Sequence, residues 1–183
     1  RNKHGMDYVV LQEIKELQQI DHKNEYFVFV APGVDRCLKD SENVHIIVMG
    51  ESCYPVWEQI TLPRAVKKYN LDILHCTSNT APIFCKIPLV LTLHDIIFLE
   101  PRDKNNKSVY QNMGWLYRRK VVPKILERCL RIITVSNFEK QNIIDKLNIP
   151  EKRMAMIYNG YNEWFTTFRD VADIYKSYID KPG

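Results

Sequence analysis

The stretch Pro88-Leu-Val-Leu-Thr-Leu-His94-Asp95 decides the fold of this chain. Its first six residues form an almost continuous apolar run, which is typical of a strand buried on both faces of a parallel sheet. Such a strand needs helices on both sides of its sheet. The stretch therefore predicts an α/β domain, with His94 and Asp95 at the carboxyl end of a central strand.

The same pattern extends in both directions along the chain. Further strands are predicted at residues 25–31, 44–49, 72–76, 131–135 and 153–158, and helices at 7–20, 55–69, 110–129 and 138–147. Pro63 is expected to kink or restart one helix, and Pro123 to kink or break another. This alternation predicts an open, doubly wound, mostly parallel sheet of the Rossmann-like kind over residues 1–160.

Composition restricts the function classes. The chain has 183 residues, which suits one domain, and its 26 basic and 22 acidic residues leave a net charge of +4. This excess is too small to indicate a nucleic-acid partner, although it allows a weak preference for an anionic ligand or membrane surface. Five cysteines without a C-x-x-C spacing argue against a disulfide framework or a zinc site and favour the cytoplasm.

Ligands of doubly wound sheets bind beyond the carboxyl ends of the strands. His94 stands there and can donate a hydrogen bond to a sugar hydroxyl or a phosphate oxygen, while Asp95 could orient it or bind a hydroxyl itself. The alternative is that the two residues only cap the strand and the following turn. The polar loop 77–82, which contains Asn79, suits polyol recognition, but other surface loops look similar.

Two further strand ends carry ambiguous signals. Ser136, with Glu139 three residues later, is either a helix-capping box or an anion-binding helix start, and the cap is the simpler interpretation. Asn159-Gly160 is either a tight turn or a point where the backbone approaches a ligand closely. The run 118–120 could offer charge to a phosphate or an anionic lipid, but a solvated helix face is the simpler interpretation.

Motifs of several other enzyme classes do not occur in the sequence. It contains neither a G-x-G-x-x-G or P-loop motif nor a G-x-S-x-G elbow, and no His, Cys and carboxylate cluster has metal-binding spacing. The residues alone thus predict an α/β domain with a polar cleft and no metal site.

In combination and in order, several segments resemble glycosyltransferase family 4, above all its mannosyltransferase-like members. These segments are Asn24-Glu25-Tyr26, Trp57-Glu58-Gln59, Leu62-Pro63-Arg64, Asp72-Ile73-Leu74-His75, Ser78-Asn79-Thr80-Ala81-Pro82, the run from Pro88 to Asp95, Ile133-Thr134-Val135-Ser136 and Ile157-Tyr158-Asn159-Gly160. Each motif is weak by itself, and their ordered spacing over nearly the whole chain is the specific feature.

The resemblance implies the GT-B architecture, in which two Rossmann-like domains face a cleft, and a retaining transfer that needs no cofactor or metal. The donor would be a GDP- or UDP-linked sugar, and the acceptor a glycan or a lipid-linked molecule, reached from the cytoplasm with peripheral contact to the inner face of the membrane. His94 matches the family's histidine at the reaction centre and is the expected catalytic residue. The expected substrate-binding residues are Gly5, Asn79, Asp95, Ser136, Asn159 and Gly160.

The chain departs from the family pattern at both ends. The family's first strand and Gly-rich loop are reduced to Gly5-Met6-Asp7-Tyr8, and no glutamate is followed by another eight positions later, as in the family's donor domain. Residues 161–183 are expected to form a linker, with a helix at 165–178, to a C-terminal donor domain that the chain lacks. The chain alone is therefore expected to be inactive.

Two other interpretations remain at this point. A non-catalytic α/β module that binds a glycan, a nucleotide or a protein would have the same strand pattern. A flavodoxin- or response-regulator-like domain is disfavoured, because the sequence lacks an N-terminal acidic cluster and a phosphate-binding loop.

Overall fold

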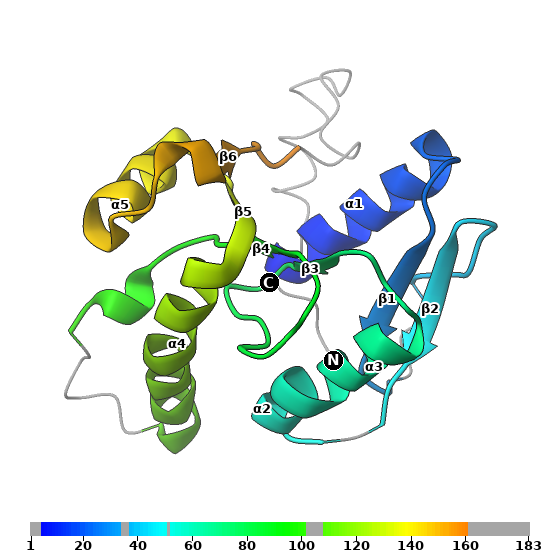
Figure 1. Cartoon of the computed structure of the whole chain (residues 1–183), viewed down its shortest axis with the longest axis horizontal. Helices are drawn as coiled ribbons and strands as arrows, with labels where there is room; N and C mark the ends of the chain where they lie inside the picture. Colours follow the sequence, from blue (N-terminus) through cyan, green and yellow to red (C-terminus); the bar gives the residue numbers. More distant parts are fainter. Residues whose placement is uncertain (1–4, 34–36, 51, 102–107, 161–183) are drawn as a thin grey trace, which may run out of the picture.

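Strands and helices alternate as predicted in the computed structural model, which describes residues 5–33, 37–50, 52–101 and 108–160 (Figure 1). The strands of this part are β1 (Tyr26–Val30), β2 (Val44–Val48), β3 (Leu74–Cys76), β4 (Leu89–Thr92), β5 (Cys129–Thr134) and β6 (Met154–Met156). The α-helices are α1 (Gly5–Ile20), α2 (Tyr54–Val56), α3 (Leu62–Lys68), α4 (Val109–Arg128) and α5 (Asn137–Leu147). The linker at 161–183 and the helix at 165–178 lie outside the described residues.

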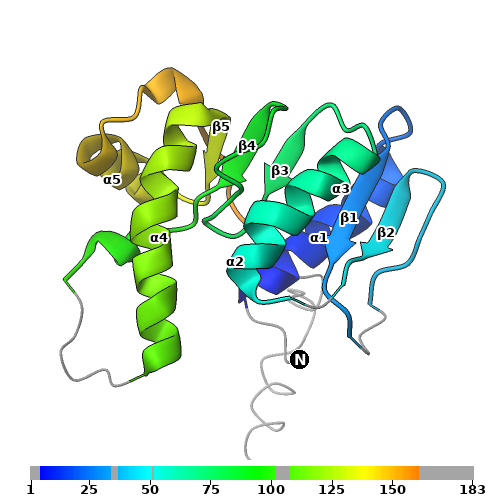
Figure 2. The same cartoon turned by 60° about the horizontal axis from the view of Figure 1, so that its bottom comes forward.

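All strand pairs of the described chain are parallel, which confirms the predicted class. The strands form two hydrogen-bonded sheets, one in the order β1-β2 and the other in the order β3-β4-β5-β6. Helices flank the strands, with α1 and α3 on opposite sides of β1 and β3, and α4 and α5 beside β5 (Figures 1 and 2). The fold is thus a Rossmann-like α/β arrangement with four adjacent parallel strands in its larger sheet.

The helix predicted at residues 55–69 forms as three consecutive pieces. After α2, the chain makes a π-helical turn, η1 (Trp57–Thr61), and continues as α3 with Pro63 in its first turn. Proline lacks the N–H group that an α-helix would pair with the carbonyl of residue 59, so a wider turn before Pro63 is physically reasonable. The predicted restart of the helix at Pro63 is therefore confirmed.

The sequence predicted that Pro123 would either kink or break the long helix, and the structure shows that it does not break it. Helix α4 continues through Pro123 to Arg128. Its neighbours Val121, Val122, Ile125 and Leu126 are all buried, so packing against the core compensates for the missing backbone hydrogen bond.

The core lies between the larger sheet and the helices that cover it. Leu91, Leu93 and Ile132 from the strands are fully buried, as are Ile125 from α4 and Ile143 from α5. The continuous apolar run that predicted the fold thus occupies the centre of the molecule.

The cysteines behave as predicted from their spacing. Cys76, Cys85 and Cys129 are buried thiols outside any disulfide. Burial raises the pKa of the Cys129 thiol to about 11, so this side chain packs as a small apolar group. In the described part of the chain, every helix is too short or too polar to cross a membrane.

Candidate functional site

Four loops meet at the carboxyl edge of the larger sheet. Because β3, β4, β5 and β6 are adjacent and parallel, the loop 77–82, residues 94–95, Ser136 and residues 157–160 all follow strand ends on the same side. Backbone pairing continues past the strand ends, from Leu93 N to Ile133 O at 2.8 Å and from Ile157 N to Thr134 O at 2.9 Å. The predicted placement of His94, Ser136 and Asn159 along one edge is therefore correct.

Asn79 joins the first two of these loops. Its backbone has a φ of 61°, in the left-handed region that asparagine tolerates better than most residues. Its N–H group donates to Thr92 O at 3.1 Å, and its Oδ1 accepts a hydrogen bond from His94 N at 2.7 Å. Asn79 thus fixes the backbone at His94 through its side-chain oxygen.

The imidazole ring of His94 is fixed by the same loop. Its Nε2 donates to Thr77 O at 2.9 Å, because a carbonyl oxygen can only accept. Nδ1 is then the ring atom left for a ligand. Partial burial raises the pKa of the Glu13 carboxyl group, and the nearby His94 opposes this shift. The His94 ring is thus half-buried, bonded to loop 77–82, and near enough to Glu13 of α1 for their charges to interact.

Asp95 faces a different space from the His94 ring. Its Oδ1 accepts a hydrogen bond from Ile97 N at 3.1 Å, which is the turn-capping role that the sequence left open. It also lines a cavity of about 330 Å³. The lining residues are Met6, Asn79, Asp95, Ile97, Phe98, Gln111, Asn112, Trp115 and Arg118.

Helix α4 supplies the opposite wall of this cavity. Asn112, Trp115 and Arg118 follow one another at intervals of three residues, so they lie on the same side of the helix. Asn112 Oδ1 and Trp115 Nε1 are buried without a hydrogen-bond partner in the described structure. The Arg119 guanidinium lies 4.6 Å from the centre of the Trp115 ring and holds it in place. The cavity thus combines a carboxylate, three amides, an indole and a guanidinium with the apolar side chains of Met6, Ile97 and Phe98.

A buried carboxylate supports the loop behind this cavity. Glu58, on η1, is 2% exposed, and its oxygens lie within 2.5–2.7 Å of the hydroxyl groups of Tyr54, Thr80 and Tyr117. Burial, together with the charge of Glu58, raises the pKa of the Tyr54 phenol, and burial also raises that of Tyr117. Both phenols therefore stay protonated at neutral pH, and each donates a hydrogen bond to the Glu58 carboxylate.

Gln59 completes this support from the neighbouring position. Its Nε2 donates to Ala81 O at 3.1 Å, and its Oε1 accepts from Ile83 N at 2.9 Å. Glu58 therefore binds the side chain of Thr80, and Gln59 binds the backbone of Ala81 and Ile83. We call this pair of residues the clamp. It orders the loop that contains Asn79, and Asn79 in turn holds the backbone of His94.

Ser136 caps α5, as the simpler interpretation of the sequence proposed. Its Oγ accepts a hydrogen bond from Glu139 N at 3.1 Å, and its backbone is extended. Glu139 Oε2 is buried without a hydrogen-bond partner in the described chain, so this oxygen does not make the return bond of a capping box. Ser136 does not line the cavity.

Ser136→Ala is expected to lower the free energy of unfolding by about 1 kcal/mol, because it removes the acceptor for Glu139 N. Urea unfolding followed by circular dichroism measures the change. Ser136→Asp keeps an acceptor at the cap and is expected to stay within about 0.5 kcal/mol of the parent. An equal loss in both variants would contradict the capping role.

The remaining predicted residues lie apart from the cavity. Gly160 and Asn159 are exposed, neither has a positive φ, and a Cβ added at Gly160 would meet no atom within 4 Å. Neither the tight left-handed turn nor a close backbone approach is therefore observed there among the described residues. Gly5 is the first residue of α1 and is exposed, although its neighbour Met6 lines the cavity.

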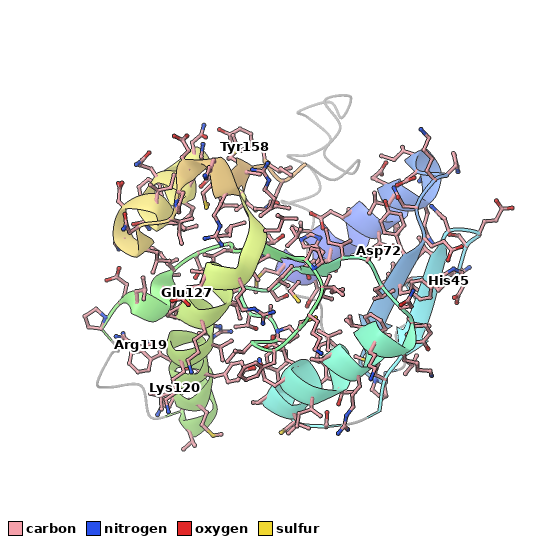
Figure 3. The ribbon with its side chains drawn as sticks, viewed as in Figure 1. His45, Asp72, Arg119, Lys120, Glu127 and Tyr158 are labelled. Atoms are coloured by element: carbon pink, nitrogen blue, oxygen red, sulfur yellow. The ribbon has the colours of Figure 1, made fainter. Side chains whose placement is uncertain are left out.

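Three large side chains are exposed near this edge, one in the first turn of α5 and two directly after β6. Phe138, Ile157 and Tyr158 are 77%, 56% and 64% exposed. The Tyr158 hydroxyl accepts a hydrogen bond from Asn137 Nδ2 at 3.1 Å, and Figure 3 shows Tyr158 beside β6, away from α4. Large side chains exposed together in this way are typical of a surface that another body covers.

The structure therefore joins Asn79 and Asp95 in one cavity, with His94 attached behind it, and leaves Gly5, Ser136, Asn159 and Gly160 outside it. Sequence reasoning missed Glu58 as a buried clamp and Asn112 and Trp115 as cavity residues. The three-residue spacing from Asn112 to Arg118 is a signal that could have identified the cavity wall. Within the described ranges, His, Cys, Asp and Glu form no group of three or more that could hold a metal.

Comparison with protein families identifies the family of this chain. A family model described as Glycosyltransferase Family 4 matches residues 4–164, which is most of the 183-residue chain and includes every part of the site described above. No curated protein matches the chain.

Proposed function

Because the chain belongs to glycosyltransferase family 4, we propose that it forms the acceptor-side domain of a retaining enzyme that transfers a sugar from a nucleotide-sugar donor. The acceptor would be a glycan or a lipid-linked molecule. The observation that carries this proposal is the cavity at the carboxyl edge of the sheet, which is bounded by the polar side chains of Asn79 and Asp95 and backed by His94.

The chemistry of the cavity suits a polyhydroxylated acceptor. The Asp95 carboxylate can accept hydrogen bonds from acceptor hydroxyl groups, and the Asn79 amide can donate to them. The Arg118 guanidinium could pair with a phosphate or carboxylate of the acceptor. These groups would orient one acceptor hydroxyl toward the reacting carbon, which is the positioning that an enzyme contributes to a two-substrate reaction.

His94 is the residue that we assign to the reaction centre. Its backbone and Nε2 are held by Asn79 and Thr77, so Nδ1 has a fixed position. A ring held in this way can stabilise charge that develops between donor and acceptor without reorganising. The transfer would need no metal and no further cofactor.

The donor would bind to a second domain, which we propose packs against the carboxyl edge. The exposed side chains of Phe138, Ile157 and Tyr158 support this placement, because a partner surface would cover them. Donor identity would then be set largely by that domain. GDP-mannose is the first candidate from the mannosyltransferase-like resemblance, and UDP-sugars are equally compatible. We also propose that the protein works in the cytoplasm.

A donor screen on the full-length protein tests this function. Each GDP- or UDP-sugar is incubated with the enzyme, and nucleotide release is measured with and without glycan and polyprenyl-phosphate-linked acceptors. We expect one donor to give acceptor-dependent release, and a product that retains the anomeric configuration by NMR. Saturable glycan binding without release from any donor would assign the chain to a non-catalytic binding module instead.

A further inference from the structure

Two side chains attach helix α4 to the rest of the site from opposite flanks. Tyr117, Arg118 and Arg119 are consecutive residues of α4, and successive side chains of an α-helix are about 100° apart around its axis. Arg118, the middle residue, lines the cavity. Tyr117 and Arg119 therefore project from the two flanks of the helix, one on each side of the direction in which Arg118 points.

The flank with Tyr117 faces the clamp. The Tyr117 hydroxyl donates to Glu58 Oε2 at 2.5 Å and accepts a hydrogen bond from Gln59 Nε2 at 2.7 Å. The same amide group of Gln59 donates to Ala81 O at 3.1 Å. A single side chain, that of Gln59, therefore connects α4 to loop 77–82, which forms part of the opposite wall of the cavity.

The flank with Arg119 faces η2 (Ile97–Leu99), a 3-10 turn whose first two residues also line the cavity. Arg119 Nη1 donates to Leu99 O at 3.2 Å, while its guanidinium lies 4.6 Å from the centre of the Trp115 ring. One side chain thus contacts both walls of the cavity. Figures 1 and 2 both show α4 between this green turn on one side and α2 on the other.

We call the Tyr117 hydrogen bonds and the Arg119 contacts the two tethers of α4. The described residues that line the cavity include neither Tyr117 nor Arg119, so the tethers do not recognise a ligand themselves. They fix the distance between α4 and the sheet edge instead. Hydrogen bonds weaken steeply with distance, and a misplacement of about 1 Å is enough to spoil a productive arrangement of binding groups.

We propose that Tyr117 and Arg119 are positioning residues for the acceptor, which hold α4 at the distance where both walls of the cavity contact one acceptor molecule. This inference rests on the proposed function, because it takes the cavity as the acceptor site. Loss of a tether then weakens acceptor binding. Donor binding, which we place on the second domain, and the chemical step at His94 keep their efficiency.

Steady-state kinetics of the full-length enzyme test this split. Tyr117→Phe removes the hydroxyl and keeps the ring, and Arg119→Gln removes the guanidinium. Each is expected to raise the KM for the acceptor about 5- to 10-fold, which corresponds to the net loss of one hydrogen bond. The donor KM and kcat should stay within about twofold of the parent. A general loss of stability would not separate acceptor from donor in this way.

Two matched controls remove the same groups elsewhere. Tyr26→Phe also removes a phenol hydroxyl that is bonded to a carboxylate, that of Asp21, at the start of β1. Arg131→Gln also removes a guanidinium that donates to a backbone carbonyl, Lys152 O, from β5. Both controls should leave the acceptor KM within about twofold of the parent. Equal increases in tether and control variants, or unchanged acceptor KM in both tether variants, would overturn the proposal.

Hydrogen–deuterium exchange without substrates examines the tethers separately from turnover. Exchange is expected to accelerate about 5- to 10-fold at residues 80–83 in Tyr117→Phe and at residues 97–100 in Arg119→Gln, because each segment loses a connection to α4. Unchanged exchange in both segments would refute the tethers even in an active transferase. If the donor screen reveals only glycan binding, glycan Kd replaces acceptor KM, and the same increase would support the positioning role although the transferase function had failed.

Discussion

Glu58→Ala is expected to lower the free energy of unfolding by about 3–5 kcal/mol, the largest loss of stability that we expect from one polar side chain of this protein. Glu58 is 2% exposed and is the common acceptor for the hydroxyl groups of Tyr54, Thr80 and Tyr117. Alanine leaves these donors without their acceptor in an apolar surrounding, and each unsatisfied buried group costs about 1–3 kcal/mol. Urea unfolding at neutral pH measures the change.

Two variants separate this clamp from general effects of helix substitution. Glu58→Gln keeps one acceptor oxygen and the side-chain volume, so we expect a smaller loss of about 1–2 kcal/mol. Glu16→Ala removes an exposed glutamate from α1 and should change stability by less than about 0.5 kcal/mol. A Glu58→Ala protein as stable as the Glu16→Ala protein would show that the hydroxyl cluster does not depend on Glu58.

The burial of Glu58 in this clamp could not be predicted from the sequence. A glutamate in a helical segment is normally solvated, and nothing in the local pattern indicated that Glu58 is buried. Its burial depends on Thr80 and Tyr117, which lie 22 and 59 residues away in the chain. Side-chain partners at such separations are set by tertiary packing, which a periodicity pattern does not describe.

The strands were predictable for the opposite reason. The run at residues 88–93 is apolar because both faces of β4 are covered, and Leu91 and Leu93 are fully buried. The rule that ligands bind at the carboxyl ends of parallel strands then identified the edge that contains His94 and Asp95. The rule could not predict which way each side chain turns: Asp95 lines the cavity, and His94 donates from its ring to Thr77 O.

The turn at Asn79 was only partly predictable. A polar loop was expected at 77–82, and the structure adds that Asn79 has a φ of 61° and holds His94 N through its side chain. An asparagine in a loop is compatible with many backbone conformations, so its left-handed geometry follows from the loop closure between β3 and β4.

His94→Ala is expected to lower kcat/KM of the full-length enzyme by at least about 100-fold, because the ring would stabilise charge at the reaction centre. Release of nucleotide from the donor identified in the screen measures this change. His22→Ala is the matched control, since His22 is exposed in the connection between α1 and β1, and it should keep kcat/KM within about twofold.

Two amide variants show which ring nitrogen of His94 is used. Glutamine can place its amide near the position of Nε2 and keep the bond to Thr77 O, whereas asparagine places an amide atom near Nδ1 and loses that bond. If Nδ1 contacts the substrate, His94→Asn should keep more kcat/KM than His94→Gln, although His94→Gln should be the more stable protein. The reverse order of activities would mean that His94 acts by holding loop 77–82 in place, and a His94→Ala enzyme within threefold of the parent would remove it from the reaction centre.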